Sequence, residues 1–384
     1  NECPLHCIYC FSEAGDKKSM SLSYEQIDVI IKEIVKNAVI QRITLKKESI
    51  ESKLTLSGGG EPTYCWEKFK YCVEKFKSTC NEKNITPRVM LVTNGCLSGK
   101  KSEYVIENID EINISFDGIG DVQNTQRPLK NGKGSYEIVK RFIDKCGLYK
   151  KKILIRTTIL PDNFKRIPEI VDNIFAVFPN VDCIHLEPMI YLGRAAKMEQ
   201  KEVDSCFECE NVYIDAYQMV EKKYPEREIV NSLFSYGLNE YFCSSSLGTH
   251  PWVHMDGSIM ACKDYLEEEH RVGLIYENKV AYNDNFSPML SNNKNCEKCF
   301  AYYHCAGGCN RSMPKDENGI CLEGNSRNMC RIIKDFWKKA LTNLAQEVPF
   351  CGLYPKRIGE FSFYPNYKIV KSENNLEGST RKNR

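Results

Sequence analysis

Three cysteines stand within eight residues near the start of the chain, at Cys3, Cys7 and Cys10. Cysteine thiolates bind zinc and iron–sulfur clusters, so this spacing indicates metal chemistry. Three thiolates from one short loop can bind three irons of a cubane 4Fe-4S cluster, which leaves the fourth iron open to a small molecule. Structural zinc is the alternative, but it normally takes four ligands and pairs one Cys-x2-Cys with another. The loop therefore predicts an open cluster.

The composition of the chain indicates whether its cysteines form disulfides or bind metal. It has 384 residues, 20 of them cysteines, and 42% of its residues are hydrophobic. Disulfide scaffolds are typical of short secreted chains with small cores, whereas this chain is long and no signal peptide opens it. Clustered cysteines in a reducing cytosol are more often metal ligands. We expect a cytoplasmic protein of an anaerobic or low-oxygen organism.

Charge and hydropathy argue against two classes of partner. The formal net charge is +2, and lysines are interleaved with acids instead of forming the basic stripe of a nucleic-acid-binding protein. No apolar run approaches the roughly 20 residues of a membrane-spanning helix. We expect neither nucleic acid nor a membrane as a partner.

Alternating helices and strands follow the cysteine loop and must position it. Ser23 and Gln26 form a capping box, and apolar residues then recur on one helical face. Further patterns predict strands at 53–57, 88–93, 112–116, 153–158 and 183–187, and helices at 66–76, 136–146 and 167–177. Repeated β/α units predict a parallel sheet, open or closed into a barrel. The alternation is predicted to end near residue 191.

Polar clusters follow three of the predicted strands. They are Ser-Gly-Gly-Gly-Glu-Pro at 57–62, Thr-Asn-Gly at 93–95 and Ser-Phe-Asp-Gly at 115–118. Parallel α/β folds place their active sites at the carboxyl ends of the strands. These clusters are therefore expected to form one site.

The cysteine loop resembles the signature of the radical S-adenosylmethionine (SAM) superfamily, because an aromatic residue, Tyr9, stands directly before Cys10. The resemblance implies a partial (β/α)6 TIM-like barrel in an α/β fold. It also implies that the open iron chelates the amino and carboxylate groups of SAM. One-electron cleavage then gives a 5′-deoxyadenosyl radical, which abstracts a hydrogen atom.

The same resemblance implies contacts to SAM. The glycine segment would contact the methionine amino group, Ser115 the ribose or carboxylate, and Arg127 the carboxylate through its fork of donors. A solvated loop position is the alternative for Arg127, and Asp117 is interpreted as a turn former. The segment at 192–195, Leu-Gly-Arg-Ala, resembles peptide-modifying members. The expected cofactor-binding set is Tyr9, Gly58, Gly59, Gly60, Glu61, Asn94, Ser115 and Arg127.

A second group of cysteines resembles the SPASM domain, the auxiliary-cluster domain of radical enzymes that mature peptides and proteins. The match lies in the spacing Gly257-x4-Cys262, Cys296-x2-Cys299-x5-Cys305-x3-Cys309 and a distant Cys330. The resemblance implies auxiliary cluster I on Cys243, Cys262 and Cys309, and auxiliary cluster II on Cys296, Cys299, Cys305 and Cys330. With the first loop this makes three 4Fe-4S clusters.

Alternatives remain open within this cysteine group. Cys321 could replace Cys330, and a zinc-ribbon-like module could occupy 296–309. Auxiliary cluster I has three assigned thiolates, which Cys206 and Cys209 or a substrate thiol could complete, unless that pair is incidental. Independently, Asp256 and Gly257 predict a hairpin turn before Cys262.

One departure from the related sulfatase-maturing enzymes concerns the reaction. There an aspartate directly after the Gly-x4-Cys cysteine acts as the base, whereas here Lys263 holds that position and Asp264 follows it. A shift of one residue reverses side-chain direction on a strand, so Asp264 is only a possible base. The resemblance fits better to enzymes that modify ribosomally made peptides, with a substrate cysteine supplying the sulfur of a thioether.

The expected organisation has four parts: a radical SAM domain at 1–192, a helical bridge at 193–242, a loop-rich SPASM domain at 243–345 with a closing helix at 331–345, and a polar extension at 346–384. Since the cysteine loop begins at Cys3, the first barrel strand is expected to be missing. Peptide maturases often carry a leader-recognition domain before that strand, and its existence here is left open. The expected partners are a precursor peptide and an electron donor such as flavodoxin or ferredoxin.

Thioether cross-linking is the predicted function. The alternatives are sulfatase-type oxidation to formylglycine, epimerisation, a carbon–carbon cross-link, or, outside enzymes, a zinc-binding interaction module.

Overall fold

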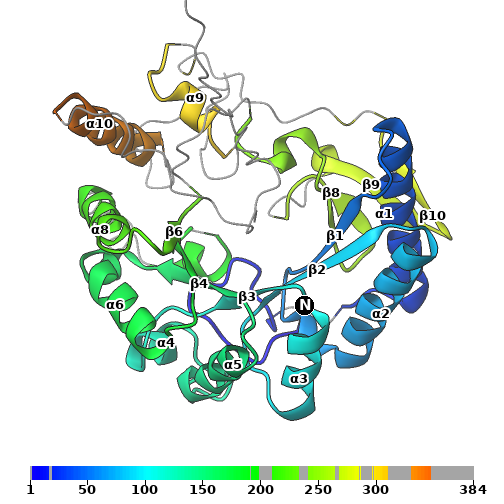
Figure 1. Cartoon of the computed structure of the whole chain (residues 1–384), viewed down its shortest axis with the longest axis horizontal. Helices are drawn as coiled ribbons and strands as arrows, with labels where there is room; N and C mark the ends of the chain where they lie inside the picture. Colours follow the sequence, from blue (N-terminus) through cyan, green and yellow to red (C-terminus); the bar gives the residue numbers. More distant parts are fainter. Residues whose placement is uncertain are drawn as a thin grey trace, which may run out of the picture.

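The computed structural model describes residues 2–16, 20–190, 192–198, 210–232, 241–263, 268–284, 286, 296, 298–309 and 330–346. A parallel sheet of six strands, paired in chain order, forms its centre (Figure 1). The strands are β1 (Glu51–Leu56), β2 (Thr86–Thr93), β3 (Glu111–Ser115), β4 (Ile153–Ile159), β5 (Cys183–Pro188) and β6 (Glu228–Val230). The predicted α/β class and the five predicted strands are confirmed, with ends shifted by one or two residues.

The prediction that the alternation ends near residue 191 is wrong. Strand β6 pairs in parallel with β5, with Cys183 opposite Glu228 and His185 opposite Val230. Helix α8 (Glu210–Lys223) precedes this strand, and its Tyr217 hydroxyl donates to the carbonyl of Ile229 at 3.0 Å. A strand of three residues is too short for a periodic pattern. The expected helical bridge therefore contributes a strand and a helix to the α/β fold.

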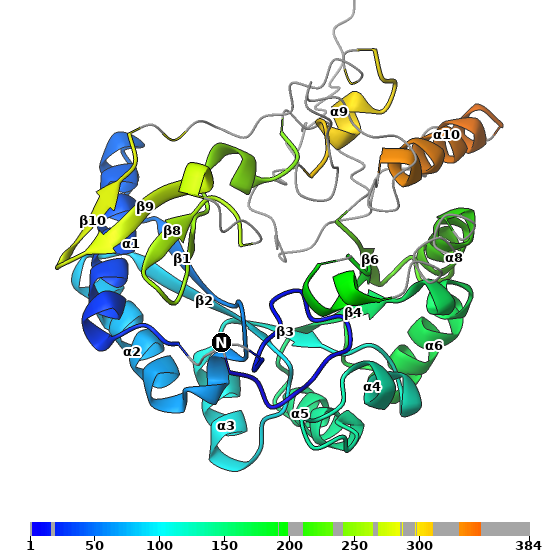
Figure 2. The same ribbon diagram turned by 180° about the vertical axis from the view of Figure 1, so that it is seen from behind.

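Helices pack on the outer side of this curved sheet (Figures 1 and 2). They are α1 (Tyr24–Thr44), α2 (Trp66–Glu82), α3 (Gly99–Asn108), α4 (Asp121–Gln126), α5 (Tyr136–Leu148), α6 (Ile167–Val177) and α8. Ile112 and Ile114 of β3 lie in the main core with helix residues such as Phe142. Because side chains alternate along a strand, Asn113 and Ser115 point to the opposite, inner side of the sheet. The inner face therefore carries polar side chains.

Helix α1 begins at the predicted capping box. The Ser23 side chain accepts from the Gln26 backbone N–H at 3.2 Å, and the Gln26 side chain accepts from the Ser23 N–H at 2.9 Å. Ile27 and Ile31 lie in the main core, whereas Val29 packs in a separate cluster with two residues of a second sheet, Ile259 and Ile275. Helix α1 thus contacts both sheets.

The second sheet is small and antiparallel, in the order β10-β9-β8-β7. Its strands are β7 (Trp252–Val253), β8 (Ser258–Met260), β9 (Arg271–Tyr276) and β10 (Lys279–Tyr282). The predicted hairpin turn joins β7 to β8, and Asp256 Oδ1 accepts from the Ser258 N–H at 2.9 Å. Gly257 has φ +88, which suits a glycine.

The helix predicted at the end of the cysteine group is confirmed as α10 (Cys330–Gln346), and α9 (Tyr302–Cys305) is a single turn. Short 3-10 helices complete the described chain: η1 (Pro62–Tyr64), η2 (Pro161–Arg166), η3 (Gly193–Lys197), η4 (Ser244–Leu247) and η5 (Glu268–His270). Within the described ranges, no helix is both long and apolar enough to cross a membrane.

Candidate functional site

The cysteine loop runs beside the segment at 126–130. Leu5 forms an isolated antiparallel bridge with Leu129, and the Ile8 N–H donates to the Gln126 carbonyl at 3.1 Å. These backbone contacts lie on each side of Cys7 and hold the loop at the carboxyl ends of the strands.

The predicted polar clusters come together with this loop. The Asn94 amide Nδ2 donates to Cys3 Sγ at 3.4 Å, and the Glu61 N–H donates to the Glu2 carbonyl at 2.8 Å. Gly58 and Gly60 have φ of +138 and +154, which β-carbon-bearing residues rarely adopt. Residues that are distant in the sequence therefore meet at one edge of the sheet, as predicted.

Glu61 is buried, and its carboxylate is used internally. It accepts from the Thr63 hydroxyl at 2.7 Å, the Thr93 hydroxyl at 2.8 Å and the Asn94 N–H at 2.7 Å. Burial raises the pKa of Glu61, while these donors act in the opposite direction. The carboxylate therefore ties the glycine segment to the end of β2 and fixes Asn94 beside Cys3.

Arg127 and Asp117 form a buried ion pair, with 3.0 Å between Arg127 Nε and Asp117 Oδ1. Asp117 is fully buried and also accepts from Gln126 Nε2 at 2.7 Å, from the Thr158 N–H at 3.0 Å and from the Tyr9 hydroxyl. The interpretation of Asp117 as a turn former is therefore wrong, and so is the solvated alternative for Arg127. Only the tertiary structure shows this, because the groups around the Asp117 carboxylate come from three separate segments of the chain.

The guanidinium of Arg127 lies 5.2 Å from the centre of the Tyr9 ring, and its Nη1 is 4.0 Å from Cys7 Sγ. Burial raises the pKa of Tyr9 well above its usual value, so the phenol stays neutral and donates to Asp117. The Arg127 guanidinium thus pairs with the Asp117 carboxylate, lies against the Tyr9 ring and approaches the thiol of Cys7, a predicted cluster ligand.

The three thiols of the loop are partly buried. Burial raises the pKa of Cys7 to about 12, against the nearby charge of Arg127, and burial also raises the pKa of Cys3. Thiols in this state are protonated, so iron binding must displace protons. Sulfur ligands with an amide donor and a cation beside them suit a thiolate-bound, negatively charged cluster. The donor set therefore fits the cluster that the sequence predicts.

The inner face of the sheet holds functional candidates that the sequence analysis missed. Ser115 lies opposite Arg156 in register, and Arg156 lies opposite His185. His185 Nε2 is 2.7 Å from a carboxylate oxygen of Glu187, and both side chains are buried. Burial lowers the pKa of His185, which therefore donates as the neutral ring. The alternation of Cys-Ile-His-Leu-Glu along β5 was the available signal, since both polar residues fall on one face.

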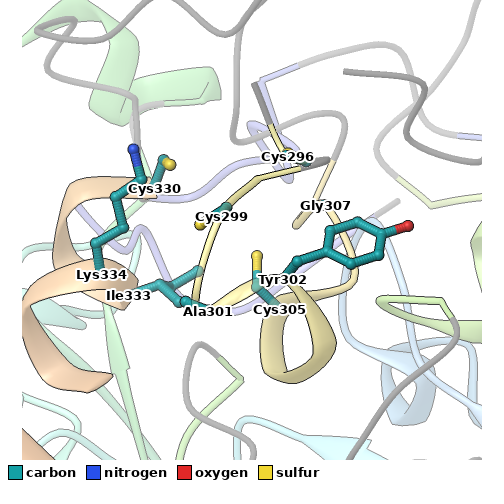
Figure 3. A pocket seen from close by; sticks show the side chains of 9 residues that line it. All are labelled: Cys296, Cys299, Ala301, Tyr302, Cys305, Gly307, Cys330, Ile333 and Lys334. Atoms are coloured by element: carbon teal, nitrogen blue, oxygen red, sulfur yellow. The ribbon is translucent and has the colours of Figure 1, made fainter. Parts of the chain in front are cut away.

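The four predicted ligands of auxiliary cluster II line one cavity with Tyr302 and Lys334 (Figure 3). They come from the segment that ends in α9 and from the first residue of α10, and they are Cys296, Cys299, Cys305 and Cys330. Burial, and then the neighbouring sulfurs, raise the pKa of Cys305 to about 12. Cys321, the alternative to Cys330, lies outside the described residues. No three Cys, His, Asp or Glu of the described chain converge on a single-ion site, although cubane ligands bind separate irons.

Cys243 caps η4, Cys262 follows β8, and Cys309 follows α9. The Lys263 ammonium lies 4.1 Å from the centre of the Phe11 ring. Since Lys263 follows Cys262 and Phe11 follows Cys10, a predicted auxiliary ligand lies close to the first cysteine loop. Asp264, and the pair Cys206 and Cys209, lie outside the described residues.

Comparison with known proteins agrees with this geometry. Residues 1–174 match the model of the radical SAM superfamily. The chain is 24% identical over 375 residues to a cysteine-type anaerobic sulfatase-maturating enzyme of Clostridium novyi, covering 90% of this chain and 94% of that protein.

Two solved structures share the fold. One is native anSMEcpe with bound AdoMet and Kp18Cys peptide, at TM-score 0.68 and 20% identity, covering 90% of this chain and 95% of that one. The other is Streptococcus suis SuiB bound to S-adenosylmethionine, at TM-score 0.50 and 15% identity, covering 84% and 74%. Residues 1–174 therefore form a radical SAM domain, and this protein is a radical SAM enzyme.

Proposed function

We propose that this enzyme forms a thioether, a bond between a cysteine sulfur and a carbon atom, in a ribosomally made, cysteine-containing peptide. Its similarity to a sulfatase-maturating enzyme, and to a structure that holds a cysteine peptide, supports a peptide or protein substrate. The thioether itself rests on the surroundings of Cys262.

In this proposal Cys3, Cys7 and Cys10 hold the cluster that binds SAM. When bound, SAM and the clusters supply a 5′-deoxyadenosyl radical, which takes a hydrogen atom from a substrate carbon, and an acceptor for one further electron. A Cβ at Gly58 would meet no heavy atom within 4 Å, so the backbone is open to a ligand there.

The polar residues around the loop have distinct tasks in this proposal. The glycine segment from Gly58 to Gly60, held by Glu61, contacts the amino group of SAM. Ser115 and Arg127 bind its carboxylate or ribose, and Asp117 keeps the guanidinium of Arg127 in place through the 3.0 Å ion pair. Tyr9 and Asn94 complete the wall of the site beside Cys7 and Cys3.

The position of Lys263 is the observation that carries the thioether. Its ammonium lies 4.1 Å from the Phe11 ring, directly after Cys262, where a carboxylate base would stand in the sulfatase-maturing pattern. A protonated lysine cannot accept a proton. Cys243, Cys262 and Cys309 would hold auxiliary cluster I, and an open iron there would supply a Lewis acid that favours the thiolate form of a substrate cysteine, so that no separate base would be needed.

The overall change is balanced within this scheme. The substrate carbon loses one hydrogen atom to the radical, and the thiol loses its proton. Closure of the carbon–sulfur bond releases one further electron, which a cluster held by Cys243, Cys262 and Cys309 would accept. The product therefore lacks two hydrogen atoms and keeps its sulfur.

Sulfatase-type oxidation is the second candidate. It is favoured by the similarity to the Clostridium novyi enzyme, which extends over 90% of this chain. This reaction converts a cysteine into an aldehyde and releases its sulfur, and it would need Asp264 or another base.

Mass spectrometry tests the proposal. The neighbouring genes would first be searched for a short cysteine-containing peptide. The reconstituted enzyme would be incubated with that peptide, SAM and a flavodoxin or ferredoxin reducing system, and the products would then be alkylated. We expect a product that has lost two hydrogen atoms and has one cysteine protected from alkylation. Loss of sulfur with a new aldehyde would support the second candidate. Loss of two hydrogens with every cysteine still alkylated would indicate a carbon–carbon link.

The matched controls are the variants Cys10→Ala and Cys262→Ala. Cys10→Ala should abolish 5′-deoxyadenosine formation, whereas Cys262→Ala should retain it and lose the cross-link. Undiminished 5′-deoxyadenosine from Cys10→Ala would remove the assignment of the first cluster.

A further inference from the structure

The segment η3, which follows β5, contacts the cysteine loop at every described position from Gly193 to Ala195. The Arg194 N–H donates to the Cys10 carbonyl at 3.0 Å, and Ala195 is fully buried in a cluster with Tyr9 and Met189. The loop therefore contacts both the segment at 126–130 and η3.

The side chain of Arg194 donates through all three of its nitrogens to this loop. Nη1 donates to the Cys7 carbonyl at 3.0 Å, Nη2 to the Ala14 carbonyl at 2.9 Å, and Nε to the Asp16 carboxylate at 2.8 Å. Only 9% of this side chain is exposed. Charge-assisted bonds from a rigid guanidinium fork fix the geometry of their acceptors, which a lysine with one ammonium cannot reproduce. Arg194 thus fixes the backbone on both sides of Cys10.

Gly193 permits this close approach. It has φ +57, and a Cβ at this position would lie 2.3 Å from the Phe11 carbonyl oxygen and 2.4 Å from that of Cys10. Both obstacles are backbone atoms of the loop, so they cannot turn aside as a side chain would. Any larger residue must push η3 and the loop apart.

We propose that Gly193 and Arg194 are positioning residues that hold the three-cysteine loop in its cluster-binding conformation. This inference rests on the proposed cluster at Cys3, Cys7 and Cys10. It gives a structural role to the segment at 192–195, Leu-Gly-Arg-Ala, for which the sequence alone shows only a resemblance to peptide-modifying enzymes. These residues contact the backbone of the loop and act through it.

The first test is hydrogen exchange of residues 4–16, followed by mass spectrometry on the enzyme with its auxiliary iron in place. Arg194→Met should speed exchange of this stretch about tenfold or more, since each lost hydrogen bond to a charged donor is worth about 1.5–3 kcal/mol. Arg166→Met is the matched control, because Arg166 pairs with Glu169 on the surface. Equal exchange in the two variants would overturn the proposal.

The second test is iron content with electron paramagnetic resonance of the reduced, SAM-bound cluster. Arg194→Met and Gly193→Ala should each lose the SAM-responsive signal and keep the auxiliary iron. Gly99→Ala is the control for Gly193→Ala, because Gly99 has φ +55 and open space around it. Full loading of the first cluster in both variants would also overturn the proposal.

If Arg194→Met and Gly193→Ala do not fold, the milder substitution Arg194→Lys tests the same proposal. It keeps a charge beside Asp16 but loses the bonds to the Cys7 and Ala14 carbonyls, so we expect intermediate exchange and a weakened signal. If the wild-type enzyme itself shows no SAM-responsive cluster, the proposed function fails. The exchange result still decides the positioning role in that case, because it needs no first cluster.

Discussion

At the scale of single residues, the site depends on charges that are buried and paired. Arg127 lies between Asp117 and Tyr9 and reaches toward Cys7, while Glu61 joins the glycine segment to Asn94. Each buried group satisfies several partners, so a change at one position affects the others.

The substitution Asp117→Asn should disturb both stability and SAM binding. It leaves the buried guanidinium of Arg127 without its counter-charge, which costs about 3–5 kcal/mol when one partner of a buried pair is removed. We expect a lower melting temperature and weaker SAM binding, measured by thermal unfolding and equilibrium titration. Asp144→Asn removes an exposed pair with Lys140 and should cost less than about 1 kcal/mol. Equal losses in the two variants would contradict the role given to Asp117.

At the scale of elements, the pairing of β6 with β5 places the partly buried carboxyl of Glu228 beside Cys183. Glu228 lies opposite Cys183, whose thiol donates to it. Burial, and then repulsion from Asp182, raise the pKa of Glu228 to about 7, against the effect of that thiol. A carboxyl whose pKa rises on folding favours the folded state most at low pH, and this contribution disappears as the pH rises from about 4.5 to 7.

Removing this charge should therefore stabilise the protein above pH 7. We expect Glu228→Gln to raise the free energy of unfolding by about 1–2 kcal/mol at pH 8, a value reduced for partial exposure, and by much less near pH 5. Unfolding curves at the two pH values would measure this, with the exposed Glu226→Gln as control. A gain that is the same at both pH values would show that the Glu228 charge is not its cause.

At the scale of the whole molecule, the contact between Lys263 and Phe11 joins the β8 side of the antiparallel sheet to the cysteine loop of the radical SAM domain. Helix α10 supplies Cys330 to the cavity lined by the predicted ligands of auxiliary cluster II, and it packs on α8, with Lys339 Nζ 2.7 Å from Asp215. The predicted auxiliary site is thus attached to the same helix that leads into β6.

We predict that the three proposed clusters can be removed separately. The double variant Cys296→Ser and Cys299→Ser should lose the iron and sulfide of one cubane and still cleave SAM to 5′-deoxyadenosine, because the proposed ligands of auxiliary cluster II are separate from Cys3, Cys7 and Cys10. Iron and sulfide analysis with product chromatography would measure this. The paired control replaces Cys80 and Cys146, which are buried in the apolar core, by alanine. Stoichiometric zinc with almost no sulfide in wild-type protein would support a zinc-ribbon-like module instead.

The sequence by itself determined the features that depend on local spacing. The capping box at Ser23, the hairpin turn at Asp256 and the five longer strands follow from residues close together in the chain, because capping and side-chain periodicity are short-range effects. The candidate cluster ligands of the first loop are predicted from local spacing in the same way. The family resemblance added the expected partners and cofactors.

Only the tertiary structure decided which distant groups meet. Tyr9 and Asp117 are 108 residues apart, Arg194 and Asp16 are 178 apart, and no periodicity links either pair. The three-residue β6 likewise forms because β5 offers it an edge and α8 covers it, not because Glu-Ile-Val is a strong strand on its own. Burial and pairing depend on the packed fold, so the contacts of Asp117, Arg127 and Arg194 are visible only in the folded chain.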